Sequence, residues 1–152
     1  MEKIISVVPA LVKKKFLGFS NETYTLIVTD TRCIFAHLSS SIMKKIALDA
    51  RADAKENGKG FFGQWGSQMA AALNYSQKYK TMNPEDILKE NEKNFELSNS
   101  SIMNVKIRMY DDQSTARTHY DVIIKSTNGK FSYRTEQDPN IELKNGLGNK
   151  VK

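Results

Sequence analysis

The basic run Lys13-Lys14-Lys15 is the strongest candidate binding site in the sequence. Neighbouring ammonium groups attract anionic head groups, and each lysine beside an anionic membrane surface contributes on the order of 1 kcal/mol. Lys44 and Lys45 would supplement this charge. A run of lysines at a predicted turn is also a common way to keep a strand edge solvated. The run therefore predicts either binding of an anionic lipid or phosphate, or an ordinary charged turn.

The second candidate is an aromatic-rich stripe. Trp65, Met69 and Leu73 recur every four residues, as on one face of a helix, and Phe61 and Phe62 come just before them. A stripe of this kind is most often core that docks on a sheet. An exposed stripe instead marks a protein–protein surface. The stripe thus predicts either core packing or an interface for a protein partner or a second copy of the chain.

Nucleic-acid binding has weaker support from the strand patterns. Proteins that bind single strands interleave cations with aromatic side chains on which bases stack. On the predicted strand faces only Tyr110 alternates with basic residues, Lys106 and Arg108. The sequence therefore disfavours a nucleic acid as partner.

Catalytic and metal chemistry finds no support in the residue pattern. His37 and His119 are isolated, and Cys33 has no second thiol nearby, so the grouped ligands of a zinc site are missing. No serine lies in a nucleophile-elbow pattern. The glycines at positions 58, 60 and 63 lack the Gly-Lys-Ser/Thr ending of a phosphate loop. The sequence predicts a non-enzymatic protein that holds no cofactor and no metal.

Length and composition predict one cytoplasmic domain that spans residues 1–152. Apolar residues make up 39% and charged residues 26% of the chain, which is typical of a globular protein. The lone Cys33 excludes an internal disulfide framework and fits a reducing compartment. No run approaches the ~18 apolar residues that a membrane span requires. The formal net charge is +6, and the excess lies toward the two ends of the chain.

Alternating apolar residues predict two groups of strands. Residues 24–38 form a hairpin that turns at Asp30, and two short strands precede it, separated by Pro9 and the lysine run. From residue 95 the period of two returns: Met103, Val105, Ile107 and Met109 mark one side of a long strand with one wet face, and further strands follow around positions 120–124 and 131–133. Asn128-Gly129 is a strong two-residue hairpin turn.

Helical spacing predicts an insertion at about residues 39–93, between the two strand groups. A first helix is capped by a serine at 39–41 and ends at Asn57-Gly58, and a second runs from about 64 to 79. Asn83-Pro84 begins a short third helix that runs to about Glu90. Near the end of the chain, residues 138–143 begin a weak helix that Asn145-Gly146 and Gly148-Asn149 would break early.

The strand patterns resemble those of bacterial pleckstrin-homology-like and GRAM-like domains. The matching positions lie at the first hairpin and at the start of the long strand: Val28, Thr29, Asp30, Arg32, Ile34 and Phe35, then Ser101, Ile102 and Val105. The resemblance implies a strongly bent antiparallel sheet that a C-terminal helix closes at one end. Related domains collect anionic head groups near the first turn. This chain departs from the pattern in its large helical insertion and its short, glycine-containing closing helix.

The sequence as a whole predicts an α+β fold: a bent antiparallel β sandwich or split barrel of the pleckstrin-homology-like kind. A large helical insertion joins the two strand groups, and a short helix ends the chain. The expected function is that of an interaction domain that binds a protein partner or self-associates through the insertion. The alternative is peripheral binding of anionic lipid or phosphate through the lysine run.

Overall fold

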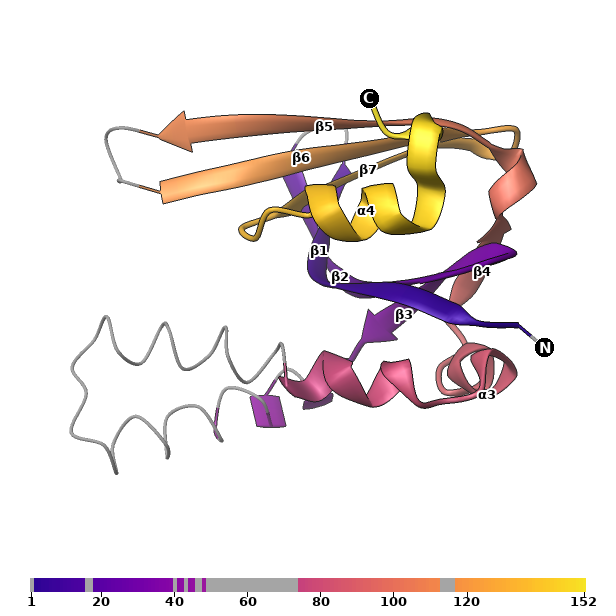
Figure 1. Ribbon diagram of the computed structural model, residues 1–152. Helices are drawn as coiled ribbons and strands as arrows, with labels where there is room; N and C mark the ends of the chain where they lie inside the picture. Colours follow the sequence, from indigo (N-terminus) through magenta and orange to yellow (C-terminus); the bar gives the residue numbers. More distant parts are fainter. Residues whose placement is uncertain are drawn as a thin grey trace.

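Seven strands of the described chain form one antiparallel sheet in the order β4-β3-β2-β1-β7-β6-β5 (Figure 1). The computed structural model describes residues 2–15, 18–39, 41–42, 44–45, 48, 74–112 and 117–152. The strands are β1 (Ile4–Lys15), β2 (Gly18–Thr29), β3 (Arg32–Leu38), β4 (Phe95–Ser98), β5 (Ile102–Asp112), β6 (Arg117–Ser126) and β7 (Gly129–Thr135). The predicted α+β class with an antiparallel sheet is confirmed.

The sheet bends at β1 into two halves. β1 pairs with β2 along most of its length but with β7 only at Val12 and Lys13. One half holds β1 to β4 and the other holds β5 to β7, and helix α4 (Asn140–Leu147) lies between them (Figure 1). The edge strands β4 and β5 do not pair with each other, so the sheet is not closed into a barrel.

The main core fills the space between the two halves. Leu143 and Leu147 of α4 are buried in it, together with inward-facing residues from both halves of the sheet. Burying side chains of this size contributes roughly 1.5–3 kcal/mol each to stability, and this burial stabilises the bent arrangement of the two halves. The other members are Val8, Leu11, Tyr24, Leu26, Val28, Cys33, Phe35, Leu97, Ile102, Val105, Val122, Ile124, Tyr133 and Val151.

Gly146 lets α4 approach the sheet closely. The sequence predicted that Asn145-Gly146 would break the helix early, and this is wrong, because α4 continues to Leu147. A Cβ atom at Gly146 would overlap the side chain of Val28 in β2. The glycine is therefore a packing residue, and the helix ends at Gly148, whose φ of +57° is accessible to glycine.

A second core covers the outer face of the β1–β3 half. Tyr79 of the 3₁₀ turn η1 (Lys78–Lys80) and Ile87 of helix α3 (Pro84–Lys89) bury Val7, Ile27, Ile34 and Ala36. Helix α3 begins as predicted, since the side chain of Asn83 accepts a hydrogen bond from the Glu85 amide and Pro84 takes the first helical position. The described end of the insertion therefore packs onto the sheet.

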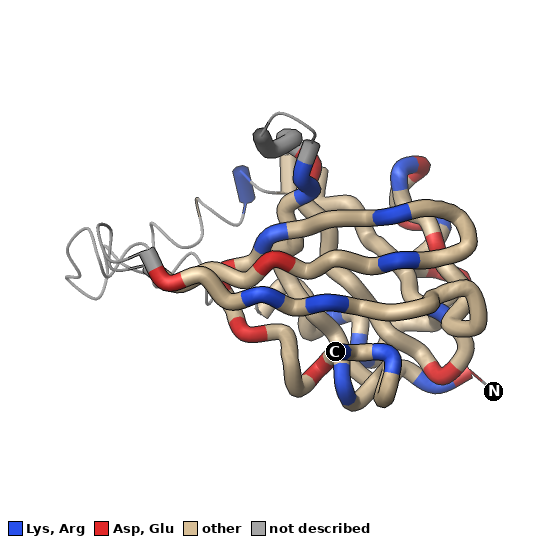
Figure 2. Tube along the Cα trace, turned by 90° about the horizontal axis from the view of Figure 1, so that it is seen from above, with Lys and Arg blue, Asp and Glu red and all other residues tan. Residues whose placement is uncertain are grey.

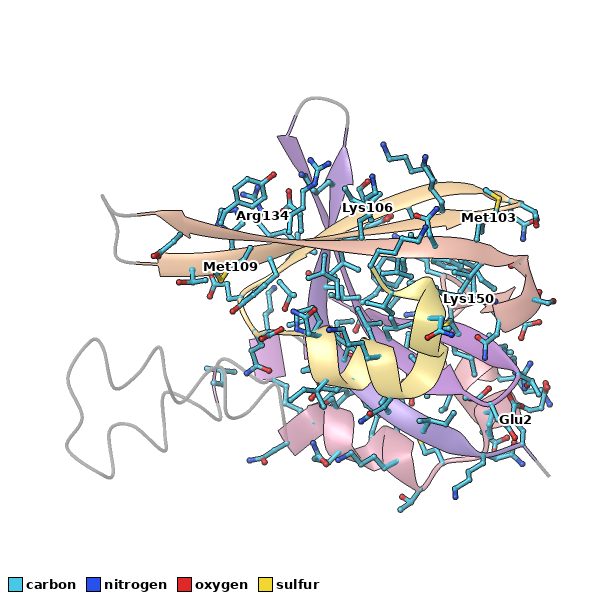
Figure 3. The ribbon with its side chains drawn as sticks, turned by 45° about the horizontal axis from the view of Figure 1, so that its top comes forward. Glu2, Met103, Lys106, Met109, Arg134 and Lys150 are labelled. Atoms are coloured by element: carbon cyan, nitrogen blue, oxygen red, sulfur yellow. The ribbon has the colours of Figure 1, made fainter. Side chains whose placement is uncertain are left out.

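Two strand predictions need correction. Pro9 does not separate two strands, because β1 runs through it with a register shift between Val8 and Leu11 and with Ala10 at a φ of +57°. In the described residues, three strands rather than four thus precede the insertion. In β5, Met103 and Met109 are exposed rather than inward-packed: the register shifts between Ile102 and Asn104, and Met109 lies toward the end of the strand that extends beyond α4 (Figures 1 and 3).

The remaining helix predictions lie mostly outside the described residues. Ser41, Ile42, Lys44, Lys45 and Leu48 are helical, and the Ser39 hydroxyl accepts a hydrogen bond from the Ile42 amide at 3.3 Å, as a capping serine does. Residues 74–77 are helical and lead into η1. There are two further described 3₁₀ turns: η2 (Asn99–Ser101) directly precedes β5, and η3 (Gly148–Lys150) directly follows α4.

Candidate anionic-ligand interface

The outer face of the β5–β7 half presents its side chains in rows that cross the three strands. The register sets these rows, because directly paired residues of antiparallel strands point to the same side. From one end of the sheet to the other the rows are Asn104–Lys125–Lys130, Lys106–Ile123–Ser132, Arg108–Asp121–Arg134 and Tyr110–His119. Lys14 joins the third row from β1, since its ammonium contacts Asp121 at 2.8 Å. Figure 3 shows Lys106 and Arg134 projecting from the outer side of this half.

This face concentrates positive charge. Among described strand side chains it carries six cations, Lys14, Lys106, Arg108, Lys125, Lys130 and Arg134, against one carboxylate, Asp121, a net charge of +5. The whole chain has a formal net charge of +6. Figure 2, which looks down on β5 to β7, shows basic residues on all three strands. Positive charge is therefore concentrated on this face of the described chain.

Asp121 holds two of these cations in place. Its carboxylate accepts hydrogen bonds from Lys14 at 2.8 Å and from Arg134 at 3.1 Å, and only 7% of its side chain is exposed. Burial alone would raise the pKa of Asp121, but the hydrogen bonds from Lys14 and Arg134 outweigh it and lower the pKa below its ordinary value. Asp121 thus stays ionised and braces the junction of β1, β6 and β7.

The other four cations lack such a partner. Lys106, Arg108, Lys125 and Lys130 are exposed, and no carboxylate of the described part of the chain lies within ion-pair distance of them. Lys125 and Lys130 are direct cross-strand neighbours. Like charges placed directly opposite each other destabilise a sheet. These side chains are therefore available to a ligand and are kept together at a cost to folding.

An aromatic pair ends the face. The rings of Tyr110 on β5 and His119 on β6 stack with centroids 5.1 Å apart and planes 19° apart. Tyr110 is 42% exposed, although large aromatic side chains usually gain stability by burial. An aromatic surface is thus displayed beside the cationic rows.

Arg32 lies on the half of the sheet that η1 and α3 cover, and, unlike the four exposed cations, it is paired with carboxylates. The Arg32 guanidinium, 15% exposed, bonds to Glu2 at 2.8 Å and Glu85 at 2.7 Å, and also to Glu96. The hydrogen bonds that Arg32 donates to Glu2, ahead of the opposing effect of burial, raise the pKa of Arg32. Burial alone would raise the pKa of Glu2, but hydrogen bonds from Arg32 and two threonines outweigh it and lower that pKa. Arg32 therefore ties the N-terminal segment, α3 and β4 together.

The predicted lysine run lies at the end of β1 rather than in a turn. Lys14 contributes to the outer face through Asp121, whereas Lys13 pairs with Glu22 at 3.8 Å. Lys15 pairs in register with Gly18. Lys44 and Lys45 are exposed in the helical segment after β3, on the opposite side of the molecule from the outer face of β5–β7 (Figure 1). The structure thus brings only Lys14 of this predicted set to the interface.

The predicted partner interface falls in the middle of the helical insertion. Phe61, Phe62, Trp65, Met69 and Leu73 lie outside the described residues. The sequence missed the interface residues on β6 and β7, because cross-strand rows are invisible in a single strand pattern. The predicted Asn128-Gly129 turn is displaced by one residue: Ser126 pairs with Gly129, so the two loop residues are Thr127 and Asn128. This register, which the sequence did not predict, places Lys125 opposite Lys130.

No group of three or more His, Cys, Asp or Glu that could hold a metal ion occurs among the described residues. Burial raises the pKa of Cys33 to about 12, more than nearby Lys150 lowers it, so the thiol stays protonated at neutral pH. The Cys33 side chain lies in the main core. Burial lowers the pKa of His37, because it disfavours the charged imidazolium.

Comparisons with family models, with curated proteins and with solved structures find no match for this chain. None of the helices in the described part of the chain is both long and apolar enough to span a membrane.

Proposed function

We propose that the chain is a non-enzymatic binding module whose outer β5–β7 face binds an anionic partner. One observation carries the proposal: four cations, Lys106, Arg108, Lys125 and Lys130, stand exposed on this face without a described carboxylate partner. A concentrated field of one sign raises the local concentration of oppositely charged ligands and speeds their association.

The cost of keeping these charges together supports the proposal. Lys125 directly opposite Lys130 is an unfavourable pair, and a Glu or Thr at either position would relieve it. On the covered half of the same sheet, Arg32 is neutralised by three carboxylates. The chain therefore contains counter-charges but places none beside these two lysines.

We also propose kinship with the pleckstrin-homology-like and GRAM-like domains. The residues that carry the resemblance lie at the β2–β3 turn, from Val28 to Phe35, and at the start of β5, at Ile102 and Val105. A bent antiparallel sheet with a helix at its C-terminal end supports this kinship. In this chain the proposed anion site is the β5–β7 face, with Lys14 at its margin. A lone buried Cys33 supports a cytoplasmic location.

Inorganic polyphosphate tests the proposal, because it supplies negative charge without bases or acyl chains. The test variant replaces Lys106, Arg108, Lys125 and Lys130 by Gln. A matched variant replaces Lys3, Lys80, Lys89 and Lys144, which are exposed on other elements, and removes the same charge. Calorimetry at low salt should show binding to the native protein and the matched variant, and at least about tenfold weaker binding to the test variant. Equal losses in both variants would overturn the proposed location.

Partner binding or self-association through Phe61, Phe62, Trp65, Met69 and Leu73 stays a prediction. Light scattering measures the oligomeric state of the native protein, and tryptophan fluorescence measures the exposure of Trp65. A strict monomer with a fully buried Trp65 would contradict the self-association part.

A further inference from the structure

We infer that the anionic ligand is a single-stranded nucleic acid, whose backbone follows the cationic rows and whose base stacks at Tyr110. This inference rests on the proposed function and names the ligand of that site. The observation behind it is that four cations without a described carboxylate partner share one face with an aromatic pair, of which Tyr110 is exposed.

The spacing of the face suits an extended chain of charges. Same-side residues in a strand are two positions apart, or about 7 Å, so the rows succeed one another at that interval. Cations occupy three successive rows, and the Tyr110–His119 row follows directly after Arg108. A ligand lying along β5 and β6 therefore meets positive charge first and an aromatic surface next.

Tyr110 has the exposure that a stacking platform needs. One face of its ring packs on His119 at a centroid distance of 5.1 Å, and β5 is an edge strand of the sheet. With 42% of the residue exposed, the ring is accessible to a planar group. Stacking on aromatic side chains is how sequence-tolerant single-strand binders hold bases, beside a cationic track for the backbone.

The sequence disfavoured a nucleic acid because only one aromatic residue accompanied basic residues on a predicted strand face. The register of the sheet removes that objection. The pattern of β5 alone showed one aromatic residue, Tyr110, on the same side of the strand as Lys106 and Arg108. Pairing of β5 with β6 and β7 adds His119 to the aromatic row and Lys125, Lys130 and Arg134 to the cationic rows.

A membrane or a duplex fits this face less well. Among the exposed large apolar side chains, Met109 lies on the inner side of β5, Ile141 lies on α4, and Met103 lies at the register shift between Ile102 and Asn104. The cationic rows themselves therefore offer no strongly exposed aliphatic side chain for insertion into a bilayer. A broad sheet face also cannot enter a major groove that is about 12 Å wide, whereas a helix or two-stranded ribbon can. An unpaired strand, with bases free to stack, matches both features of the face.

Fluorescence anisotropy of the full chain tests the inference. The probes are labelled oligodeoxythymidylate and oligouridylate of roughly 12 nucleotides, a length within common site sizes, at low salt. Tyr110→Ala should weaken binding roughly 5- to 140-fold, which corresponds to the loss of one stacked base. Tyr110→Phe should retain binding because it keeps the ring. Met109→Ala, on the same strand but the opposite face, is the matched control and should leave binding unchanged. The two probes distinguish RNA from DNA as the source of the same chemistry.

The outcomes separate this inference from the proposed function. Oligonucleotide binding that is insensitive to Tyr110→Ala, with polyphosphate binding still lost in the Lys106, Arg108, Lys125 and Lys130 variant, would overturn the inference and leave the proposed function standing. Binding to phosphatidylserine vesicles without binding to either oligonucleotide would overturn it in favour of a membrane. Absence of binding to any polyanion would overturn both. Far-ultraviolet circular dichroism of each variant controls for folding.

Discussion

The two outer faces of this bent sheet meet solvent in opposite ways. On the β1–β3 half, Ile27, Ile34 and Ala36 are covered by η1 and α3. On the β5–β7 half, the outward-facing residues are instead cations and an aromatic pair, and no described segment covers them (Figures 1 and 2). The outer face of one half is thus buried by other segments of the same chain, whereas the outer face of the other half is a surface suited to another molecule.

The two halves also differ in how they treat charge. Arg32, on the β1–β4 half, forms ion pairs with three carboxylates. Arg108, on the open outer face of the β5–β7 half, forms no ion pair with a described carboxylate. An arginine in a network of carboxylates serves to hold segments together. An unpartnered arginine on a crowded positive face adds nothing comparable to folding, which is consistent with a role in binding.

Truncating one isoleucine on each outer face is expected to give the largest contrast. Ile34→Ala should lower the free energy of unfolding by about 2–5 kcal/mol, because Ile34 is fully buried and leaves a cavity. Ile123→Ala, on the half-buried open face, should cost about 1 kcal/mol or less. Urea denaturation measures both. Similar losses would mean that the open face is covered after all.

Exchanging one arginine on each half is expected to give the next contrast. Arg32→Met should destabilise the fold by ~1–3 kcal/mol, because Glu2, Glu85 and Glu96 would then repel one another, with Glu85 and Glu96 partly screened by solvent. Arg108→Met should leave the unfolding midpoint nearly unchanged and weaken oligonucleotide binding. A stability loss at Arg108 equal to that at Arg32 would contradict the division of roles.

Acid should destabilise the protein through the two braced carboxylates. The pKa values of Glu2 and Asp121 are lower in the folded protein than their ordinary values of 4.5 and 3.8. Their contributions are therefore complete above the unfolded pKa values and are lost as pH falls through the folded ones. Urea midpoints measured from about pH 6 down to about pH 3 should fall, and fall less steeply in Arg32→Met and in Lys14→Met. A native pH dependence that both variants retain in full would contradict these pairings.

Single cations of the open face should each have a small, measurable effect on salt dependence. For a single strand, the slope of log K against log salt changes by about 0.7 for each phosphate contact, so Lys130→Gln should reduce the slope by about that amount. Lys144→Gln on α4 is the control and should leave the slope unchanged. An unaltered slope in Lys130→Gln would remove that lysine from the interface.

Local signals in the sequence predicted the local structure well. Asn83-Pro84 predicted the start of α3, and Asn128-Gly129 predicted where β6 turns into β7, although the loop residues are Thr127 and Asn128 because Gly129 pairs with Ser126. Pro9 misled because β1 accommodates it with a register shift and a positive φ at Ala10, which depends on pairing with β2. Gly146 misled because its role is contact with Val28, which is distant in sequence.

The candidate site was harder to predict because it is a property of strand register. The lysine run was visible as a motif, yet two of its charges pair with Glu22 and Asp121. Lys106, Lys125 and Lys130 are scattered in sequence and meet only when three strands align. A sequence pattern shows which side of one strand a residue occupies, but the neighbours across the sheet depend on long-range pairing.

Isoleucine methyl NMR tests the central claim most directly, because isoleucines lie on all the relevant surfaces. Ile123 is on the open outer face, Ile34 and Ile87 are on the covered one, and Ile124 is in the main core. Titration with inorganic polyphosphate at low salt should shift the Ile123 methyl signal and leave those of Ile34 and Ile87 in place. A stationary Ile123 signal, with shifts confined to Ile141 on α4 or Ile5 on β1, would contradict the assignment of the open face as the binding surface.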